Sequence, residues 1–163
     1  MIIRQAEMKD VQEMLDIYNY EVMNGTATLD LREKTYEEWE VWMLEHFTCN
    51  YKILAAEIDN QVAGYATLSS YREKEAFSST VELSVYVSRN FRKQGVASAL
   101  MEEIIRLARE DESIHMIVSV ITSGNKASEA LHDKFGFVHA GTLHQVGYKQ
   151  GKYQDIDNYE LIL

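Results

Sequence analysis

The sequence predicts one α/β domain, built on a mixed, mostly antiparallel sheet with helices on both faces. Strand-like and helix-like segments alternate along the whole chain. The order strand, helix, strand over 81–121 is typical of a right-handed crossover between two parallel strands. Strand pairs with short turns are expected on both sides of this unit. No linker, repeat or low-complexity segment divides the 163 residues, so a single domain over 1–163 is expected.

The first half of the chain is expected to hold a strand, two helices and a strand hairpin. Apolar residues recur at helical spacing over 9–22, and the Asn24-Gly25 pair ends that run. "TYEE", from Thr35, is a capping-box pattern that starts the second helix. The expected elements are strand 2–6, helix 9–22, an irregular connector 26–30, a helix from Thr35 to about Phe47, and strands 51–58 and 61–71 joined by a tight turn at Asp59-Asn60.

The second half supplies the crossover unit and the closing strands. Residues 81–87 alternate, which places apolar side chains on one face and Glu82, Ser84 and Tyr86 on the other. The expected elements are strand 81–87, helix 96–108, strand 115–121, a helix from Lys126 to Phe135 that stops at Gly136, and strands 137–146 and 153–163 around "GYKQGK".

Composition excludes several classes of partner. Asp and Glu number 26 against 16 Lys and Arg, for a net charge of −10, which argues against nucleic acid and anionic membrane surfaces. No apolar run approaches the length of a membrane span. The first ten residues are too short and too charged for a signal peptide, so a cytoplasmic protein is expected. Cys49 is the single cysteine and has no evident base or cation partner, so neither a disulfide nor an acetyl-cysteine intermediate is expected.

The basic turn "RKQGVAS" (92–98) suits a phosphate group. The first amides of a helix have no intrahelical partner, and the helix dipole adds positive potential there. Gly95 lets the backbone approach a ligand closely, and Arg92 and Lys93 add charge. An ordinary strand-to-helix turn with solvated charges is the alternative reading of this segment alone, because it is not a Walker P-loop.

Two segments together resemble the GCN5-related N-acetyltransferases. "RKQGVASALM" resembles the signature of Gln or Arg, two residues, Gly, one residue, then Gly or Ala, and "GNKASEALHDKFGF" (124–137) resembles the second signature. "NGTATLD", "TYEEW", "TVELSVYVS", "ALHDKFGF" and "VGYKQGKYQD" are similar to the phosphinothricin acetyltransferase branch, which includes methionine sulfoximine and sulfone acetyltransferases. The chain departs from the branch at Lys74, Phe77 and Tyr153, and it lacks two of the branch's usual prolines.

The resemblance implies a fold, a reaction and a partner. The fold is a mixed, splayed sheet that grips acetyl-CoA, usually in a homodimer. The reaction moves the acetyl group to the primary amine of a small amino-acid-like acceptor by direct attack in a ternary complex. The residues implied to bind acetyl-CoA are Gln94, Gly95, Val96, Ala97 and Ser98 through their amides at the pyrophosphate, Arg92 and Lys93 beside it, the backbone of Val85, Tyr86 and Val87 along the pantetheine arm, and Asn125. Asn125 could equally be a helix N-cap.

Two side chains are candidates for proton transfer. Glu82 stands in a strand, where Glu is disfavoured, just before the expected thioester site, and a carboxylate can take the proton that an ammonium acceptor must lose. A solvated surface carboxylate is the alternative. The branch usually carries His at the position of His132, whose pKa range suits either proton donation or base catalysis; a helix-face His bonded to a neighbour is the alternative.

The acceptor pocket has four candidates. Arg72 and Lys74 could bind an acceptor's carboxylate or phosphinate, although exposed surface charge is the default reading. Phe77 and Thr28 are further candidates. The histidines lack metal-ligand spacing, so no metal is expected. Two other functions remain open: an acetyltransferase for another small amine or a protein N-terminus, and a non-catalytic acyl-CoA-binding sensor.

Overall fold

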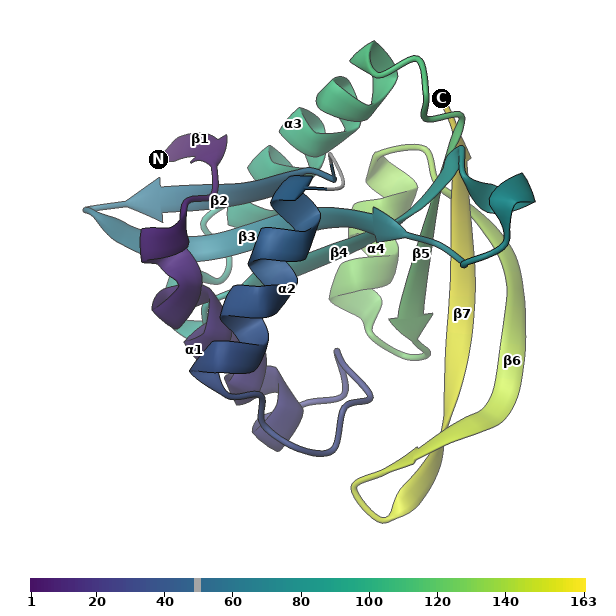
Figure 1. Ribbon diagram of the computed structural model, residues 1–163. Helices are drawn as coiled ribbons and strands as arrows, with labels where there is room; N and C mark the ends of the chain where they lie inside the picture. Colours follow the sequence, from purple (N-terminus) through teal and green to yellow (C-terminus); the bar gives the residue numbers. More distant parts are fainter. Residues whose placement is uncertain (49–50) are drawn as a thin grey trace.

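The computed structural model describes residues 1–48 and 51–163. Cys49 lies outside the described residues, so its predicted lack of a catalytic role stays a prediction. One seven-stranded sheet runs through the molecule in the order β1-β2-β3-β4-β5-β7-β6 (Figure 1). Its strands are β1 (Ile2–Gln5), β2 (Ile53–Ile58), β3 (Gln61–Ser70), β4 (Thr80–Val87), β5 (Met116–Thr122), β6 (Val138–Lys149) and β7 (Lys152–Ile162). All neighbours are antiparallel except β4 and β5, which confirms the predicted mixed sheet.

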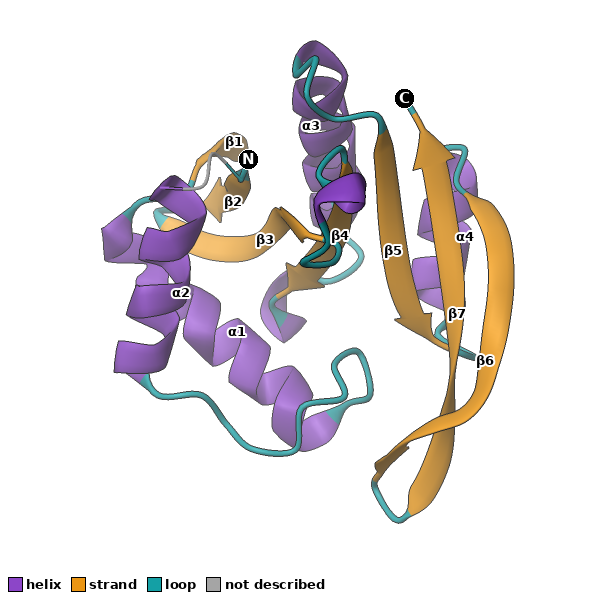
Figure 2. Cartoon of the chain, turned by 45° about the vertical axis from the view of Figure 1, so that its right-hand side comes forward, coloured by secondary structure: helices purple, strands orange, loops and turns teal. Residues whose placement is uncertain are grey.

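Helices cover both faces of the sheet, as predicted. The helices are α1 (Val11–Asn24), α2 (Tyr36–Thr48), α3 (Val96–Glu110) and α4 (Lys126–Lys134). Figure 2 shows α1 and α2 together on one side and α3 and α4 on the other. We call the α1/α2 side the front face and the α3/α4 side the back face. Within the described residues, no helix is both long and apolar enough to cross a membrane.

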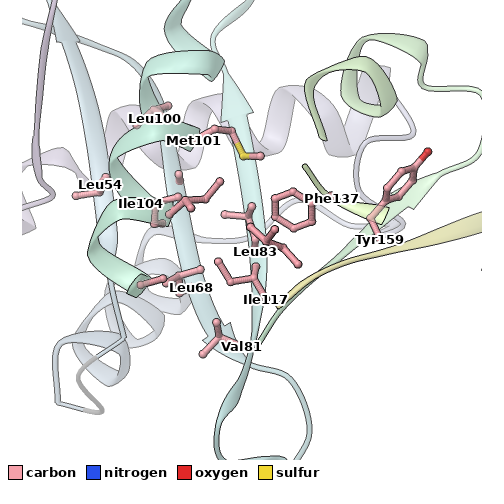
Figure 3. Close-up of a cluster of buried hydrophobic side chains, with 14 of the residues drawn as sticks. Leu54, Leu68, Val81, Leu83, Leu100, Met101, Ile104, Ile117, Phe137 and Tyr159 are labelled. Carbon is pink, nitrogen blue, oxygen red and sulfur yellow. The ribbon is translucent and has the colours of Figure 1, made fainter. Parts of the chain in front are cut away.

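Two hydrophobic clusters hold these layers together. The back cluster packs α3 against the middle of the sheet through Leu100, Met101 and Ile104, with Phe137 and Tyr159 at its α4 end (Figure 3). The front cluster packs α1 and α2 on β2 and β3 and contains Trp39 and Tyr65. The alternation within β4 divides its side chains between the two, since Val81 and Leu83 are buried in the back cluster and Tyr86 packs against the front one.

Local sequence signals account for the element ends. Asp59 and Asn60 both have positive φ, at 50° and 60°, as a two-residue turn between β2 and β3 requires. The capping box forms as predicted, with the Thr35 amide donating to Glu38 at 2.8 Å and the Glu38 amide donating to Thr35 Oγ1 at 3.2 Å. The turn of the closing hairpin was predicted only to lie within "GYKQGK". In the structure the two strands run through most of this segment, and the chain turns only at Gln150-Gly151, where both residues have positive φ.

The parallel pair β4 and β5 stays together for only three residue pairs, the last of which is Glu82–Val118. Beyond that pair β4 makes backbone strand pairs with β3 alone among the described residues, and β4 and β5 diverge as a fork (Figure 1). A fork in the middle of a sheet leaves one edge of β4 open next to the start of α3.

Candidate active site

A cavity of about 600 Å³ occupies the fork. The open edge of β4 forms one wall, the turn before α3 a second, and β5 with the start of α4 a third. The predicted site residues that line it are Val85, Tyr86, Val87, Arg92, Lys93, Gly95, Val96, Ala97, Ser98, Asn125 and His132. The cavity therefore brings the end of β4 and the turn before α3 together with Asn125 and His132, which lie further along the chain.

The turn before α3 presents bare backbone to the cavity. Gly95 is the N-cap of α3 with φ of 81°, and a Cβ added there would meet nothing within 4 Å. Lys93 also has positive φ, at 62°, so two residues of this turn adopt the left-handed backbone conformation. This open space over unpaired helix amides suits a phosphate group. Val96 itself is buried in the core, so only its backbone is available to a ligand.

Arg92 is already engaged in an ion pair. Its Nη2 donates to Oε1 of Glu21, near the end of α1, and Glu21 also lines the cavity. The pair ties α1 to the turn before α3. An anionic ligand at the turn would therefore compete with Glu21 for Arg92. Gln94 does not line the cavity, and its side chain donates to the carbonyl of Asn90 at 3.3 Å.

Asn125 is the N-cap of α4, which is the structural role given above as the alternative to binding acetyl-CoA. Its Oδ1 accepts from the amide of Ser128 at 3.2 Å and caps α4. It also lines the cavity, so capping does not remove it from a ligand's reach. Ser98 Oγ accepts from Lys134 at 3.2 Å, which links the start of α3 to the end of α4.

Glu82 lies at the last paired position before the fork. It pairs with Ser69 on β3 and Val118 on β5, on the front face. Its side chain is partly buried, and burial raises its pKa above the ordinary value. Within the described part of the chain its carboxylate has neither a hydrogen-bond nor an ion-pair partner. A partly desolvated carboxylate without a partner is suited to accept a proton.

His132 is buried on the back face, with 3% of its surface exposed. Its Nδ1 lies 2.8 Å from the carbonyl oxygen of Ser128, and its Nε2 lies 2.8 Å from Oγ of Ser119 on β5. Burial lowers its pKa, while the Ser128 carbonyl and Asp133 oppose that effect. His46 on α2 repeats the arrangement on the front face, between the carbonyl of Trp42 and Oγ of Ser69, and burial lowers its pKa too.

The lowered pKa values of His46 and His132 predict how the stability of the folded protein depends on pH. Because their pKa values are lower in the folded protein than in the unfolded chain, the unfolded chain binds protons first as the pH falls through about 6.5. We expect the midpoint of thermal unfolding to drop by roughly a few degrees between pH 7.5 and 5.5, measured by differential scanning fluorimetry. His46→Gln should shrink this drop, and His115→Gln, at an exposed position, should not. An unchanged drop in His46→Gln would contradict the assignment.

The four acceptor-pocket candidates lie outside the cavity lining. Arg72 is exposed on the loop after β3, and its guanidinium carbon lies 4.9 Å from the ring centre of Tyr71 and 5.7 Å from that of Phe77. Lys74 is exposed on the same loop. This loop starts beside the Glu82 end of β4, since Ser70 pairs with Val81. It can therefore meet an acceptor that approaches Glu82 from the front.

The Thr28 hydroxyl is part of an internal network. It bonds to the hydroxyl of Tyr18 at 2.9 Å and accepts from the amide of Asp30 at 3.2 Å. Its neighbours Thr26 and Ala27 line the cavity instead. Thr28 therefore orders the connector after α1.

Lys149, at the end of β6, fixes the same connector and is 4% exposed. Its Nζ donates to the carbonyl of Thr28 at 2.7 Å and reaches the carbonyl of Glu21 at 3.4 Å. Burial lowers its pKa, and Asp30 and Glu21 oppose that effect. One buried ammonium thus joins the closing hairpin to the end of α1 and to the wall of the cavity.

Replacing Lys149 should loosen this wall. Lys149→Met keeps the apolar stem but leaves the Thr28 carbonyl without its donor, so we expect about 1–3 kcal/mol less stability in urea denaturation. Limited proteolysis should then cut the connector 25–34 faster. Lys152→Met, at an exposed position on the next strand, is the matched control. Equal stability and equal cleavage in the two variants would show that the buried ammonium does not hold the connector.

Sequence reasoning missed three residues of this region. Ser119 had a visible signal, because it is the one hydroxyl within the apolar run "MIVSVI". No feature of the sequence distinguished Glu21 or Lys149, since helices and hairpins carry charged residues throughout. Within the described residues no group of three or more His, Cys, Asp or Glu is placed to hold a metal.

A cavity between diverging strands that ends at a phosphate-suited helix start fits an elongated ligand with a phosphate group at one end. Residues 14–137 match the model of the acetyltransferase (GNAT) family. An L-methionine sulfoximine/L-methionine sulfone acetyltransferase of Pseudomonas paraeruginosa is 36% identical over 99% of this chain and 94% of its own. The chain therefore belongs to the acetyltransferase (GNAT) family and is an N-acetyltransferase.

Solved structures agree with this assignment. A structure described as ribosomal-protein-alanine N-acetyltransferase from Brucella melitensis superposes with a TM-score of 0.97 and 37% identity, over 100% of both chains. A phosphinothricin acetyltransferase from Sinorhizobium meliloti in complex with acetyl-CoA superposes with a TM-score of 0.96 and 27% identity, over 99% of this chain and 88% of the other. The predicted family and the predicted splayed sheet are confirmed.

Proposed function

We propose that this protein transfers the acetyl group of acetyl-CoA to the primary amine of a small amino-acid-like acceptor. The acceptor would be of the phosphinothricin or methionine sulfoximine and sulfone type that the names of its relatives state. One observation carries the proposal: the fork cavity joins an open strand edge to a phosphate-suited turn. Glu82, which has no partner within the described residues, lies at the last strand pair before this cavity and outside its lining. We propose one catalytic domain over 1–163.

The cavity offers the pyrophosphate, the pantetheine arm and the thioester of acetyl-CoA partners of matching chemistry. The turn at 92–98 would take the pyrophosphate through its amides, with Lys93 and Arg92 beside it and Asn125 across the cavity. The open edge of β4 at 85–87 would bond to the pantetheine arm as a further strand does, and one of its amides would stabilise the oxyanion. The thioester then lies at the apex of the fork, next to Glu82.

Glu82 would take a proton from the acceptor's ammonium so that the neutral amine can attack the thioester directly. The acceptor would approach from the front face. Arg72 and Lys74 would bind its carboxylate, and Phe77 would contact its side chain. We keep Thr28 as a residue that shapes the pocket through the connector.

An assay of thiol release tests the function. The purified protein is incubated with acetyl-CoA and, in turn, phosphinothricin, methionine sulfoximine, methionine sulfone and a panel of simple amines, and the product is identified by mass spectrometry. We expect N-acetylation of at least one amino-acid-like amine. Binding of acetyl-CoA in isothermal titration without thiol release for any amine would favour the acyl-CoA-binding sensor instead.

A protein N-terminus is the second candidate acceptor. It is favoured by the near-identical fold of the structure described as ribosomal-protein-alanine N-acetyltransferase. A peptide that starts with alanine belongs in the same assay, and its kcat/KM against the free amino acids separates the two candidates.

We also propose that the protein acts in the cytoplasm as a homodimer. Exposed apolar side chains gather on β6 and β7, where a second copy could cover them: Val138, Leu143, Val146, Tyr148, Tyr153 and Ile162. Sedimentation equilibrium should give twice the chain mass at micromolar concentration, and a monomer at these concentrations would reject the dimer.

A further inference from the structure

Ser119 is a buried hydroxyl at the fork to which the proposed function gives no role. Its Oγ lies 2.8 Å from Nε2 of His132 and 3.3 Å from the carbonyl oxygen of Leu83. Leu83 directly follows Glu82, the last residue of β4 that pairs with β5. If β4 and β5 continued to pair, their next backbone contact would be made at Leu83. The Ser119 hydroxyl makes a contact there instead, and Ser119 lines the cavity.

The partners of His132 fix where the hydrogens lie. The carbonyl oxygen of Ser128 can only accept, so Nδ1 of His132 carries the proton of the neutral ring. Nε2 is then an acceptor. The Ser119 hydroxyl has one hydrogen, which it can donate to the Leu83 carbonyl at 3.3 Å or, over the shorter distance of 2.8 Å, to Nε2. Because burial lowers the pKa of His132, the ring is neutral near pH 7. Both ring nitrogens are occupied, so a proton reaches Nε2 only through Ser119.

Ser119 and Glu82 approach the apex of the fork from opposite faces. Glu82 is in register with Val118, whose neighbour Ser119 points to the other side of β5. Ser119 is in register with Tyr159, which belongs to the back cluster. Because Ser119 Oγ reaches the Leu83 carbonyl across the gap between β4 and β5, a tetrahedral intermediate at the apex would meet the hydroxyl as well as the carboxylate.

We propose that Ser119 and His132 form a proton shuttle for the acetyl transfer, in which Ser119 touches the reacting atoms and His132 holds the proton. The inference rests on the proposed function, and it makes Ser119 a catalytic residue that the sequence did not reveal. It also assigns His132 a role through Ser119 in place of direct contact with the sulfur.

The shuttle moves the second of the two protons that an ammonium acceptor loses. Glu82 takes the first, and the amine then forms the N–C bond while the carbonyl electron pair moves to oxygen. One proton of the positively charged nitrogen next passes to Ser119 Oγ, while the Ser119 proton passes to Nε2 of His132. The oxyanion electron pair then re-forms the carbonyl as the C–S bond breaks and its electron pair goes to sulfur. A proton returns from Nε2 through Ser119 to give the free thiol. The third proton stays on the amide product.

Variants at Ser119 test the shuttle in steady-state kinetics. Ser119→Ala should lower kcat on the order of 10²-fold and leave KM for acetyl-CoA within about threefold. Ser119→Thr keeps the hydroxyl and suits a strand, so it should recover at least a tenth of the wild-type kcat. Ser123→Ala removes a hydroxyl that is buried just after the same strand and outside the cavity lining, and it should match the wild type. In a His132→Phe background, Ser119→Ala should cost less than about threefold, because the two residues act as one unit.

Three outcomes overturn the shuttle. One is a kcat of Ser119→Ala equal to that of the wild type, and another is a Ser119→Thr variant as slow as Ser119→Ala although both bind CoA normally. The third is full additivity of the Ser119 and His132 substitutions. These outcomes leave the proposed function intact, whereas a wild-type protein that acetylates no amine overturns both.

Discussion

Glu82→Gln is expected to lower kcat by about 10²–10⁴-fold while leaving the affinity for CoA unchanged. The carboxylate lies at the apex of the fork, on the face from which the acceptor would approach, and has no partner within the described residues. Gln preserves its size and its place in the strand but cannot take a proton. The loss should therefore fall on the chemical step, since the cofactor would bind along β4 and the turn before α3.

The pH dependence gives this result a second signature. Burial raises the pKa of Glu82, so the carboxylate loses its ability to accept a proton as the pH falls through a value above the ordinary one. The kcat/KM of the wild type should decline on that acidic side. In Glu82→Gln the small residual activity should lack this decline.

Stopped-time thiol release and isothermal titration with CoA supply the two measurements. Glu102→Gln, at an exposed position of α3, is the matched control and should behave as the wild type. A Glu82→Gln variant with wild-type kcat at every pH would remove Glu82 from the role of base. A variant that loses CoA binding in proportion to kcat would instead assign it to the architecture of the fork.

Gly64→Ala is expected to lower both the stability of the fold, by about 1–3 kcal/mol, and the affinity for CoA. A Cβ at this position of β3 would lie 2.7 Å from the carbonyl oxygen of Tyr86, 3.0 Å from Cγ1 of Val96 and 3.2 Å from Cα of Val87. Two of these atoms belong to the backbone of β4, so they cannot turn away as the end of a side chain does. The strand and the start of α3 must move apart instead.

The same displacement should weaken cofactor binding, because Tyr86, Val87 and Val96 all line the cavity. We expect a fall of roughly 3–10 °C in the midpoint of thermal unfolding and at least a tenfold weaker CoA affinity at a temperature where the variant is folded. Gly147→Ala is the control: its Cβ would meet the flexible end of Leu29 at 2.9 Å, which can rotate. Equal midpoints for Gly64→Ala and the wild type would contradict the close approach.

Patterns that repeat along the chain predicted most of the fold. The alternation of 81–87 and the capping box at Thr35 depend on neighbouring residues alone, so they could be read directly. The end of the closing hairpin could not, because Gln150-Gly151 is one of several polar turns that "GYKQGK" allows. Register along the whole pair β6 and β7 decides between them.

The candidate site was predictable where one segment binds through its backbone, as the turn around Gly95 does. It was not predictable where a side chain's partner comes from far along the chain. Glu21 meets Arg92 across 71 positions, and Lys149 meets Thr28 across 121. A role for Ser119 can be inferred only from its contact with His132 and from its position where β4 and β5 separate.

The open edge of β4 has a consequence for the lifetime of the protein in a cell. A strand edge without a partner is a place where local unfolding and pairing with foreign chains begin. A pantetheine arm bound along it would complete the sheet, so the ligand would act as part of the folded structure. A cofactor concentration of 100 times its Kd adds about 2.7 kcal/mol to stability. The abundance of this protein should therefore follow the CoA supply of the cell, with starvation exposing the enzyme to proteases before any change in its synthesis.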